Sequence, residues 1–198
     1  MPFIRLQCND KWHLLYLNLM SNKIYFYVII FVHKKNRINF VLIIILNHIT
    51  IMAKEIIGLA SDHAAFQLKQ FVKSYLDEKG LSYKDYGTYN EKSCNYADYG
   101  HALANGIERG EVEKGIAMCG SGEGISMTLN KHQNIRAGLC WIPEIAHLIR
   151  QHNDANVLVM PGRFIDNKMA SLIMDEFLNT EFEGGRHLDR INSIPVNK

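Results

Sequence analysis

Short apolar runs alternate with longer amphipathic segments along the second, larger part of the chain. The first run, residues 55–60, has the pattern of a buried strand, and the apolar positions after it recur at helical spacing until Gly80. The same order of strand and helix occurs four more times. The predicted strands are 55–60, 81–86, 114–119, 135–140 and 157–160, and the predicted helices are 66–76, 96–109, 124–131, 143–151 and 167–178.

This alternation predicts a single α/β domain. Parallel strands need a crossover helix between them, and the connections here are short. We therefore expect a three-layer α/β/α Rossmann-like fold, with a five-stranded parallel sheet and helices on both faces. Ligands of such sheets bind at the carboxyl ends of the strands. The loops that follow the predicted strands are therefore the first places to look for functional residues.

The first 51 residues differ in composition from the rest of the chain. They contain no Gly, Ala or Glu, and their only acidic residue is Asp10. They are rich in Ile, Leu, Asn, Lys, Phe and Tyr, the bias that translation of an A+T-rich non-coding stretch would give. We expect Met52 to begin the functional domain, residues 52–198, and residues 1–51 to be a non-native extension that is disordered or poorly packed. A genuine anchor or targeting segment is the alternative.

Charge and apolar length argue against two classes of partner. Residues 1–51 carry six Lys and Arg against one acid, whereas residues 52–198 carry sixteen against nineteen. The functional domain is therefore not basic, and nucleic-acid binding is not expected. The apolar runs 24–32 and 40–46 are far shorter than the ~20 residues of a membrane-spanning helix, so no membrane partner is expected.

The four cysteines indicate the compartment. They show no Cys-x-x-Cys spacing, so neither a zinc site nor a disulfide framework is predicted. Free thiols fit a reducing cytoplasm, where we expect the protein to be located.

The loop after the third predicted strand places one thiol before glycines at every second position. Cys119 is followed by Gly120, Gly122 and Gly124. If a helix starts there, the loop amides form an anion-binding cup, and a thiol beside a helix N-terminus is readily deprotonated. Such a thiolate would remove a proton from a carbon beside a carbonyl, while the amides hold the enediolate oxygen. The alternative is a buried structural cysteine before a tight turn.

Several histidines and one acid are further candidates. Asp62 and His63 directly follow the first strand and would move protons between sugar oxygens or bind phosphate; alternatively they cap a helix, which explains Asp62 better than His63. His152 lies between a helix and the last strand, where it would protonate a ring oxygen or belong to an ordinary Asn- and Asp-rich turn. His101 and His132 have no evident partner in the sequence.

Three arginines would supply positive charge for a phosphate. Arg186 and Arg190 are four residues apart and share a face if they lie on a short helix. Two guanidinium groups on one face would grip a phosphate, although a solvated helix end is the alternative. Arg163, after the last strand, would add a third positive charge.

Taken together, these motifs resemble the type B ribose-5-phosphate isomerases, a family that includes galactose-6-phosphate isomerase subunits. The resemblance covers about residues 54–194, and the joint order of its motifs is more specific than any one of them. The motifs are Ser61-Asp62-His63-Ala64, Asp85-Tyr86-Gly87-Thr88, Cys119-Gly120-Ser121-Gly122, Asn130-Lys131, Ile135-Arg136-Ala137, His152-Asn153-Asp154-Ala155-Asn156-Val157-Leu158 and Glu183-Gly184-Gly185-Arg186-His187.

The resemblance implies a role for each candidate residue. Cys119 would be the base that moves a proton between C1 and C2, and Ser121 with the neighbouring loop amides would stabilise the enediolate. His152, with Asp62, would open the furanose ring, and Asn153 would contact the sugar. The phosphate would be held by His63, Arg163, Arg186 and Arg190.

The resemblance also implies what surrounds the site. No metal and no nucleotide cofactor are expected, and the site would lie at the subunit interface of a homodimer or homotetramer. Some family members use a glutamate immediately after the last loop glycine. That position is Ile125 here, so the chain is similar to the cysteine version of the family, and the role of Glu123 stays open.

The expected activity is therefore isomerisation of ribose 5-phosphate and ribulose 5-phosphate in the non-oxidative pentose phosphate pathway. A six-carbon sugar phosphate, such as allose or galactose 6-phosphate, is the alternative substrate. A non-catalytic module that binds a nucleotide or sugar phosphate would use the same fold but would not need Cys119, His152 and the arginine pair together. A thiol hydrolase would need a histidine within hydrogen-bonding distance of Cys119.

Overall fold

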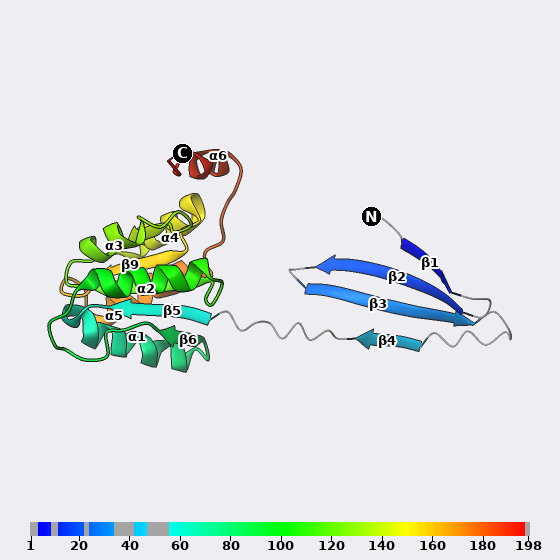
Figure 1. Cartoon of the computed structure of the whole chain (residues 1–198), viewed down its shortest axis with the longest axis horizontal. Coiled ribbons are helices and arrows are strands. Elements are labelled where there is room, and N and C mark those ends of the chain that lie inside the picture. The colour runs from blue at the N-terminus through cyan, green and yellow to red at the C-terminus, as the bar shows by residue number, and fades with distance from the viewer. Residues whose placement is uncertain (1–3, 9–11, 22–23, 34–41, 47–55, 197–198) are drawn as a thin grey trace. The chain divides into compact units, whose positions relative to one another are not determined.

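The computed structural model describes residues 4–8, 12–21, 24–33, 42–46 and 56–196. The chain divides into two compact units, Met1–Ala53 and Lys54–Lys198 (Figure 1). Within the described ranges, no helix combines the length and the apolar character needed to cross a membrane. Met52, the predicted start of the functional domain, lies outside the described residues.

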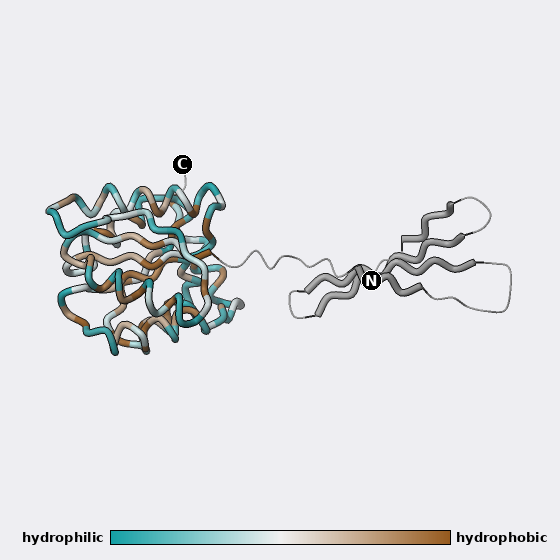
Figure 2. Tube along the Cα trace, turned by 90° about the horizontal axis from the view of Figure 1, so that it is seen from below, coloured by the Kyte–Doolittle hydropathy of each residue, from teal (hydrophilic) through white to brown (hydrophobic). Residues whose placement is uncertain are grey.

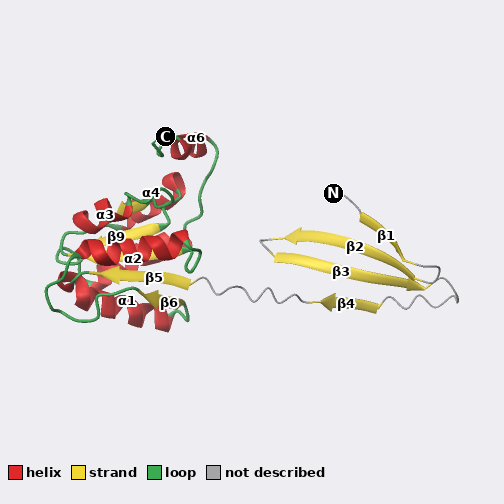
Figure 3. Ribbon diagram, in the orientation of Figure 1, coloured by secondary structure: helices red, strands yellow, loops and turns green. Residues whose placement is uncertain are grey.

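In the described part of the first unit, four strands pair in sequence order as an antiparallel sheet (Figure 3). They are β1 (Ile4–Cys8), β2 (Trp12–Ser21), β3 (Ile24–His33) and β4 (Leu42–Leu46). The expectation that residues 1–51 are a non-native extension, disordered or poorly packed, stays a prediction.

The second unit is built on a five-stranded sheet in the order β6-β5-β7-β9-β8. All four neighbouring pairs in this sheet are parallel. The strands are β5 (Ile56–Ser61), β6 (Ser82–Asp85), β7 (Lys114–Cys119), β8 (Ala137–Leu139) and β9 (Val157–Pro161). The predicted five-stranded parallel sheet is confirmed.

Helices cover both faces of this sheet, which confirms the three-layer α/β/α architecture (Figures 1 and 3). Helices α2 and α3 pack together on one face, and α1, α4 and α5 pack on the other. The helices are η1 (His63–Ala65), α1 (Phe66–Glu78), α2 (Tyr96–Glu108), α3 (Glu123–Leu129), α4 (Pro143–Asn153), α5 (Asn167–Asn179) and α6 (Arg186–Asn192).

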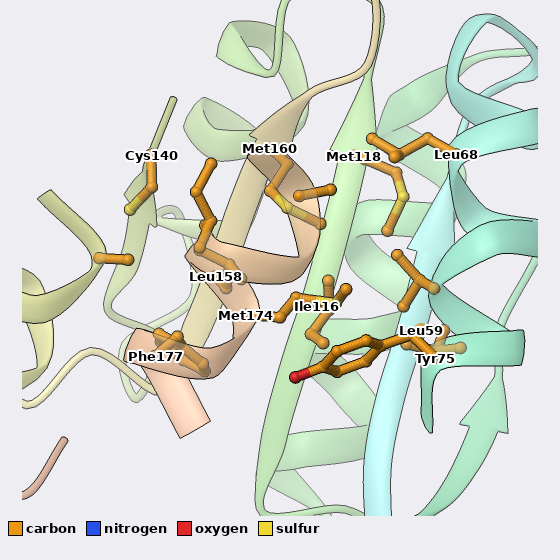
Figure 4. Close-up of a cluster of buried hydrophobic side chains, with 14 of the residues drawn as sticks. Leu59, Leu68, Tyr75, Ile116, Met118, Cys140, Leu158, Met160, Met174 and Phe177 are labelled. Carbon is orange, nitrogen blue, oxygen red and sulfur yellow. The ribbon is translucent and has the colours of Figure 1, made fainter. Parts of the chain in front are cut away.

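The two faces of the sheet bury two separate apolar clusters, because successive side chains of a strand point to opposite faces. In β7, Ile116 and Met118 belong to the cluster under α1, α4 and α5, whereas Ala117 and Cys119 belong to the cluster under α2 and α3. Figure 2 shows the apolar positions along the central strands and the hydrophilic ones on the outer helices. Figure 4 shows the first cluster, where Leu59 and Leu158 pack beside Ile116.

All the predicted strand and helix boundaries lie within two residues of the observed ones, and one of the two-residue differences has a local cause. The predicted strand 135–140 is shortened to Ala137–Leu139. Ahead of it, the N–H of Ile135 donates to the carbonyl of His132, and the N–H of Arg136 donates to Asn156 Oδ1. These two donors are used by a turn and a side chain, so the strand ladder begins only at Ala137.

The strand order also fixes where a ligand is expected. From β5 the chain moves outward to β6 and then returns to the other side of β5, where it forms β7. The carboxyl ends of β5 and β7 therefore flank the point at which the strand order reverses, and such sheets bind ligands there. Asp62 and Cys119 are the residues at this place.

Candidate active site

Asp62 lies directly after β5, beside the end of β7. Its N–H donates to the carbonyl of Met118 at 3.2 Å, which ties the two strand ends together. Its Oδ1 accepts hydrogen bonds from the N–H groups of Ala64 at 3.0 Å and Ala65 at 3.1 Å. Asp62 is therefore the N-cap of η1, and only one of its two carboxylate oxygens is used for capping in the described part of the chain.

Cys119 is the last residue of β7 and is only 4% exposed. Its carbonyl accepts the N–H of Gly162 at 2.9 Å, and the carbonyl of Gly120 accepts the N–H of Arg163 at 3.0 Å. A Cβ added to Gly120 would lie 3.5 Å from the guanidinium of Arg163. The thiol loop and the Arg163 loop therefore run side by side, and the cation lies against the loop backbone.

The two residues before α3 set the shape of the loop. Gly122 has φ +79°, and a Cβ there would come within 2.4 Å of Leu139 Cδ1, so a side chain fits neither the backbone nor the space. Ser121 is exposed, and its Oγ accepts the N–H of Glu123 at 3.4 Å, which leaves its hydroxyl proton available to a ligand. At Gly124, an added Cβ would meet the ring of Tyr96 at 2.5 Å.

His63 is held in one tautomer. Its Nδ1 accepts the N–H of Cys94 at 3.2 Å, so this nitrogen carries the lone pair and the neutral ring is protonated at Nε2. The half-buried ring thus offers a donor rather than an acceptor at its outer nitrogen. A donor suits the predicted contact with a phosphate.

The carboxyl edge of the sheet thus places the Cys119 thiol, the Asp62 carboxylate, the His63 imidazole and the Arg163 guanidinium around a glycine loop. Among the residues that the structure describes, no histidine forms a hydrogen bond to the Cys119 thiol. This geometry offers no histidine partner of the kind that a thiol hydrolase requires. It is compatible with proton transfer beside a carbonyl and with binding of an anion.

His152 and Asn153 lie at the opposite edge. They end α4, ahead of β9, whose last residue Pro161 pairs with Cys119. Five residues of strand span about 13 Å, so these side chains do not meet the thiol of the same chain. A cavity of about 540 Å³ opens at this amino edge, and Asn153 is among its lining residues.

Two arginines shape the turn that carries His152 and Asn153. Asp154 ends α4 in the left-handed region, at φ 45°. Its Oδ2 accepts from Arg136 at 3.0 Å and its Oδ1 accepts from Arg150 at 2.8 Å. Arg136 also donates to the carbonyls of Asn153 and Asp154. The carboxylate is thus held from both sides, which fixes the direction in which the turn leaves the helix.

Arg186 and Arg190 are both exposed and lie on α6, which packs against α4. The N–H of Glu183 donates to the carbonyl of Gln151 at 3.0 Å, which attaches the segment before α6 to α4. The arginine pair therefore belongs to the amino edge, with His152, whereas Arg163 belongs to the carboxyl edge.

His187 holds α6 against α4. It is 3% exposed, and its ring stacks on that of His152 with centroids 4.3 Å apart and planes 7° from parallel. Burial lowers the pKa of His187, and the charges of His152, Arg186 and Arg190 lower it further, against the opposing effect of Glu183.

Each predicted site residue thus falls at one of the two edges. The carboxyl edge holds Asp62, His63, Cys119, Gly120, Ser121, Gly122, Gly124 and Arg163, and the amino edge holds His152, Asn153, Arg186 and Arg190. Within one chain the two sets lie at opposite edges of the sheet. The expectation that the site lies at a subunit interface, where two copies would bring the sets together, stays a prediction.

The sequence reasoning missed residues whose partners are far away along the chain. No partner of His101 or His132 is evident in the sequence, yet His101 Nδ1 lies 2.9 Å from His132 Nε2, and His132 Nδ1 lies 3.0 Å from Glu108 Oε2. The roles of His187 and Arg136 had no local signal either. The contact between Tyr96 and Gly124 had none, since the two residues are 28 positions apart in the sequence.

The chain matches the family described as Ribose/Galactose Isomerase over residues 57–194. The Escherichia coli protein named ribose-5-phosphate isomerase B is 40% identical over 138 residues, which cover 70% of this chain and 93% of that protein. A putative sugar phosphate isomerase of Rickettsia bellii is 41% identical over 138 residues and is covered to 96%.

Solved structures support the same family. A ribose 5-phosphate isomerase from Thermotoga maritima superposes with a TM-score of 0.70 at 48% identity, over 71% of this chain and 97% of that one. Ribose-5-phosphate isomerase B from Mycoplasma genitalium, solved with bound ribulose-5-phosphate, has a TM-score of 0.67 at 35% identity and is covered to 93%. By its sequence and its fold, the chain belongs to the ribose/galactose isomerase family.

Proposed function

We propose that this enzyme interconverts ribose 5-phosphate and ribulose 5-phosphate through an enediolate. One observation carries the proposal: Cys119 ends the strand beside the reversal of strand order, with Asp62 and the Arg163 loop bonded to the same strand end. Relatives named ribose-5-phosphate isomerase B, aligned over almost the whole of their own length, support the choice of substrate.

In the proposed mechanism, Cys119 is the base. Its thiolate takes the proton from C2 of the open-chain aldose, and the electron pair left on C2 forms the enediolate while negative charge moves to the carbonyl oxygen. The thiol then returns the proton to C1, while the proton of the C2 hydroxyl passes to the C1 oxygen, and the product is the ketose. The Ser121 hydroxyl and the amides of Gly120, Gly122 and Gly124 donate to the oxygen on which charge develops.

The remaining residues prepare the substrate. His152, with Asp62, opens the furanose ring by giving a proton to the ring oxygen and taking one from the C1 hydroxyl. Asn153 contacts the sugar hydroxyls. His63, Arg163, Arg186 and Arg190 hold the phosphate, which fixes the sugar over the thiol.

The proposed site is assembled from two copies of the chain. Cys119 and His152 lie at opposite edges of one sheet, about 13 Å of strand apart, so a second copy must bring its amino edge to the carboxyl edge of the first. A homodimer or a homotetramer built on such dimers satisfies this requirement. The exposed Arg186 and Arg190 then reach the phosphate of the neighbouring subunit.

The proposal includes neither a cofactor nor a metal among the catalytic groups, and no nucleic-acid partner. We place the protein in the reducing cytoplasm, in agreement with the free thiols of Cys94, Cys119 and Cys140. The second candidate substrate is a six-carbon sugar phosphate, because the description of the matched family names galactose as well as ribose.

The test is isomerisation of ribose 5-phosphate by the full chain, with Cys119→Ala compared with Cys140→Ala. The control thiol is buried on the other face of the sheet, where burial raises its pKa to about 12. We expect Cys119→Ala to lower kcat by about 10²–10⁴-fold, the usual contribution of a general base, with KM nearly unchanged.

Wild-type turnover in Cys119→Ala would remove the proposed base. A folded wild-type chain could instead be inactive on ribose 5-phosphate and active on allose or galactose 6-phosphate. That result would show that the substrate is a six-carbon sugar phosphate and would leave the proposed mechanism unchanged.

A further inference from the structure

Three potential metal ligands converge at the amino edge of the sheet. His152 ends α4, Glu183 lies in the segment before α6, and His187 lies in the first turn of α6. Their ligand atoms all lie within 4.8 Å of one another. Glu183 Oε2 is 3.9 Å from His152 Nε2, and Glu183 Oε1 is 4.0 Å from His187 Nε2.

The environment of His187 Nε2 independently indicates that this cluster binds a ligand. The side chain is 4% exposed, and its buried Nε2 has no hydrogen-bond partner among the residues that the structure describes. Buried ring nitrogens are normally paired, because an unpaired polar atom loses its hydration and gains nothing in return. This nitrogen faces the Glu183 carboxylate at a distance too long for a hydrogen bond but suited to an ion between them.

A second group in the molecule has the same composition and a different geometry. Glu108, His132 and His101 form a chain in which His132 uses one ring nitrogen for each neighbour. The hydrogen-bonding capacity of His132 is thereby used, and the three ligand atoms do not converge on one point. Two histidines and a glutamate are therefore not sufficient, and among the described residues only His152, Glu183 and His187 bring their three ligand atoms within 4.8 Å of one another.

We propose that His152, Glu183 and His187 form a site for a divalent transition ion of the zinc class. Two imidazoles and one carboxylate suit zinc, and they leave one of four positions open. Parallel rings cannot both direct an in-plane lone pair at one ion, so the His152 ring turns when the ion binds. Its side chain is 35% exposed and has room to do so, whereas buried His187 stays fixed.

Occupation of this site inhibits the enzyme, an inference that rests on the proposed function. A zinc ion takes the lone pair of His152, so the imidazole no longer exchanges protons with the sugar ring oxygen. Arg186 and Arg190 lie on α6 with His187, and their positive charges repel a divalent cation. The site is therefore weaker than a structural zinc site, and zinc acts as a reversible inhibitor rather than as a permanent part of the protein.

The experiment titrates the full chain with Zn²⁺ alone, in competition with a chromogenic zinc indicator. Because the chain has nine histidines and four cysteines, the readout is the difference between variants rather than total zinc. We expect Glu183→Gln and His187→Gln each to weaken one site by roughly 100-fold, since even loss of an outer-shell partner costs 10–100-fold. His101→Gln is the matched control and should leave zinc binding unchanged.

Glu183 is half exposed, so Glu183→Gln keeps the test decisive if His187→Gln does not fold. Equal zinc binding by wild type and Glu183→Gln would overturn the site. Isomerase activity is then measured with increasing zinc, and wild type should be inhibited at lower concentrations than Glu183→Gln. Zinc bound at this site with turnover unaffected would overturn the inhibition and the proposed role of His152, whereas normal turnover without zinc binding would overturn only the metal site.

Discussion

At the scale of single residues, the Glu111 carboxylate accepts hydrogen bonds from three side chains. Its Oε1 accepts from Arg109 Nε at 2.7 Å, and its Oε2 accepts from Lys84 Nζ at 2.7 Å and from the Tyr86 hydroxyl at 2.8 Å. The hydrogen bond from Arg109, followed by those from Lys84 and Tyr86, lowers the pKa of Glu111 to about 2. The carboxylate therefore ties the end of α2 to β6 only while it is ionised.

This predicts a pH-dependent contribution to stability. Because the folded-state pKa lies below the unfolded value of about 4.3, the contribution is fully present above pH ~4.3 and is lost as the pH falls towards 2. We expect Glu111→Gln to have a lower urea midpoint than wild type at pH 7, and the difference to close between pH 4.3 and 2. Parallel curves over this range would show that the ionised carboxylate contributes nothing.

At the scale of elements, Gly122 decides how β7 turns into α3. It has φ +79°, and an added Cβ would lie 2.4 Å from Leu139. We expect Gly122→Ala to cost about 1–2 kcal/mol for the left-handed backbone and about 1–3 kcal/mol more for overpacking, measured by urea unfolding. Gly110→Ala is the matched control, since it has φ +70° and open space around it. Equal losses in the two variants would mean that Leu139 moves aside without cost.

The elements were predictable from the sequence because each is a local pattern. Apolar runs of strand length before amphipathic segments predicted all five strands of the second sheet and its main helices. For β7, both the first and the last residue were predicted correctly. The candidate site residues were chosen because they occupy loops with distinctive chemistry, and their roles stay predictions. Partners such as His101 and His132, 31 residues apart, were not found, since their contact depends on how α2 packs beside the turn after α3.

At the scale of the whole molecule, the two edges of the sheet make a specific prediction about mixed subunits. If each site uses the Cys119 edge of one copy and the His152 edge of another, Cys119→Ala and His152→Gln damage different halves of it. A mixed dimer then contains one intact site and one doubly altered site. Refolding the two inactive variants together should restore about a quarter of wild-type activity, because half of the dimers are mixed and each has one working site.

The controls for this mixing experiment are each variant refolded alone. Activity that stays at the level of the separate variants, in a mixture shown to contain mixed dimers, would place the whole site within one chain.

The burial of Cys119 has a consequence for how its chemistry should be measured. A thiol has to be reached as well as deprotonated, and this one exposes only 4% of its surface while packing among the apolar side chains beneath α2 and α3. The rate at which an alkylating reagent modifies it therefore reports access through the loop as well as basicity. The same thiol would therefore react with a sugar phosphate small enough to enter the loop. It would be inert towards a bulkier reagent that the loop excludes.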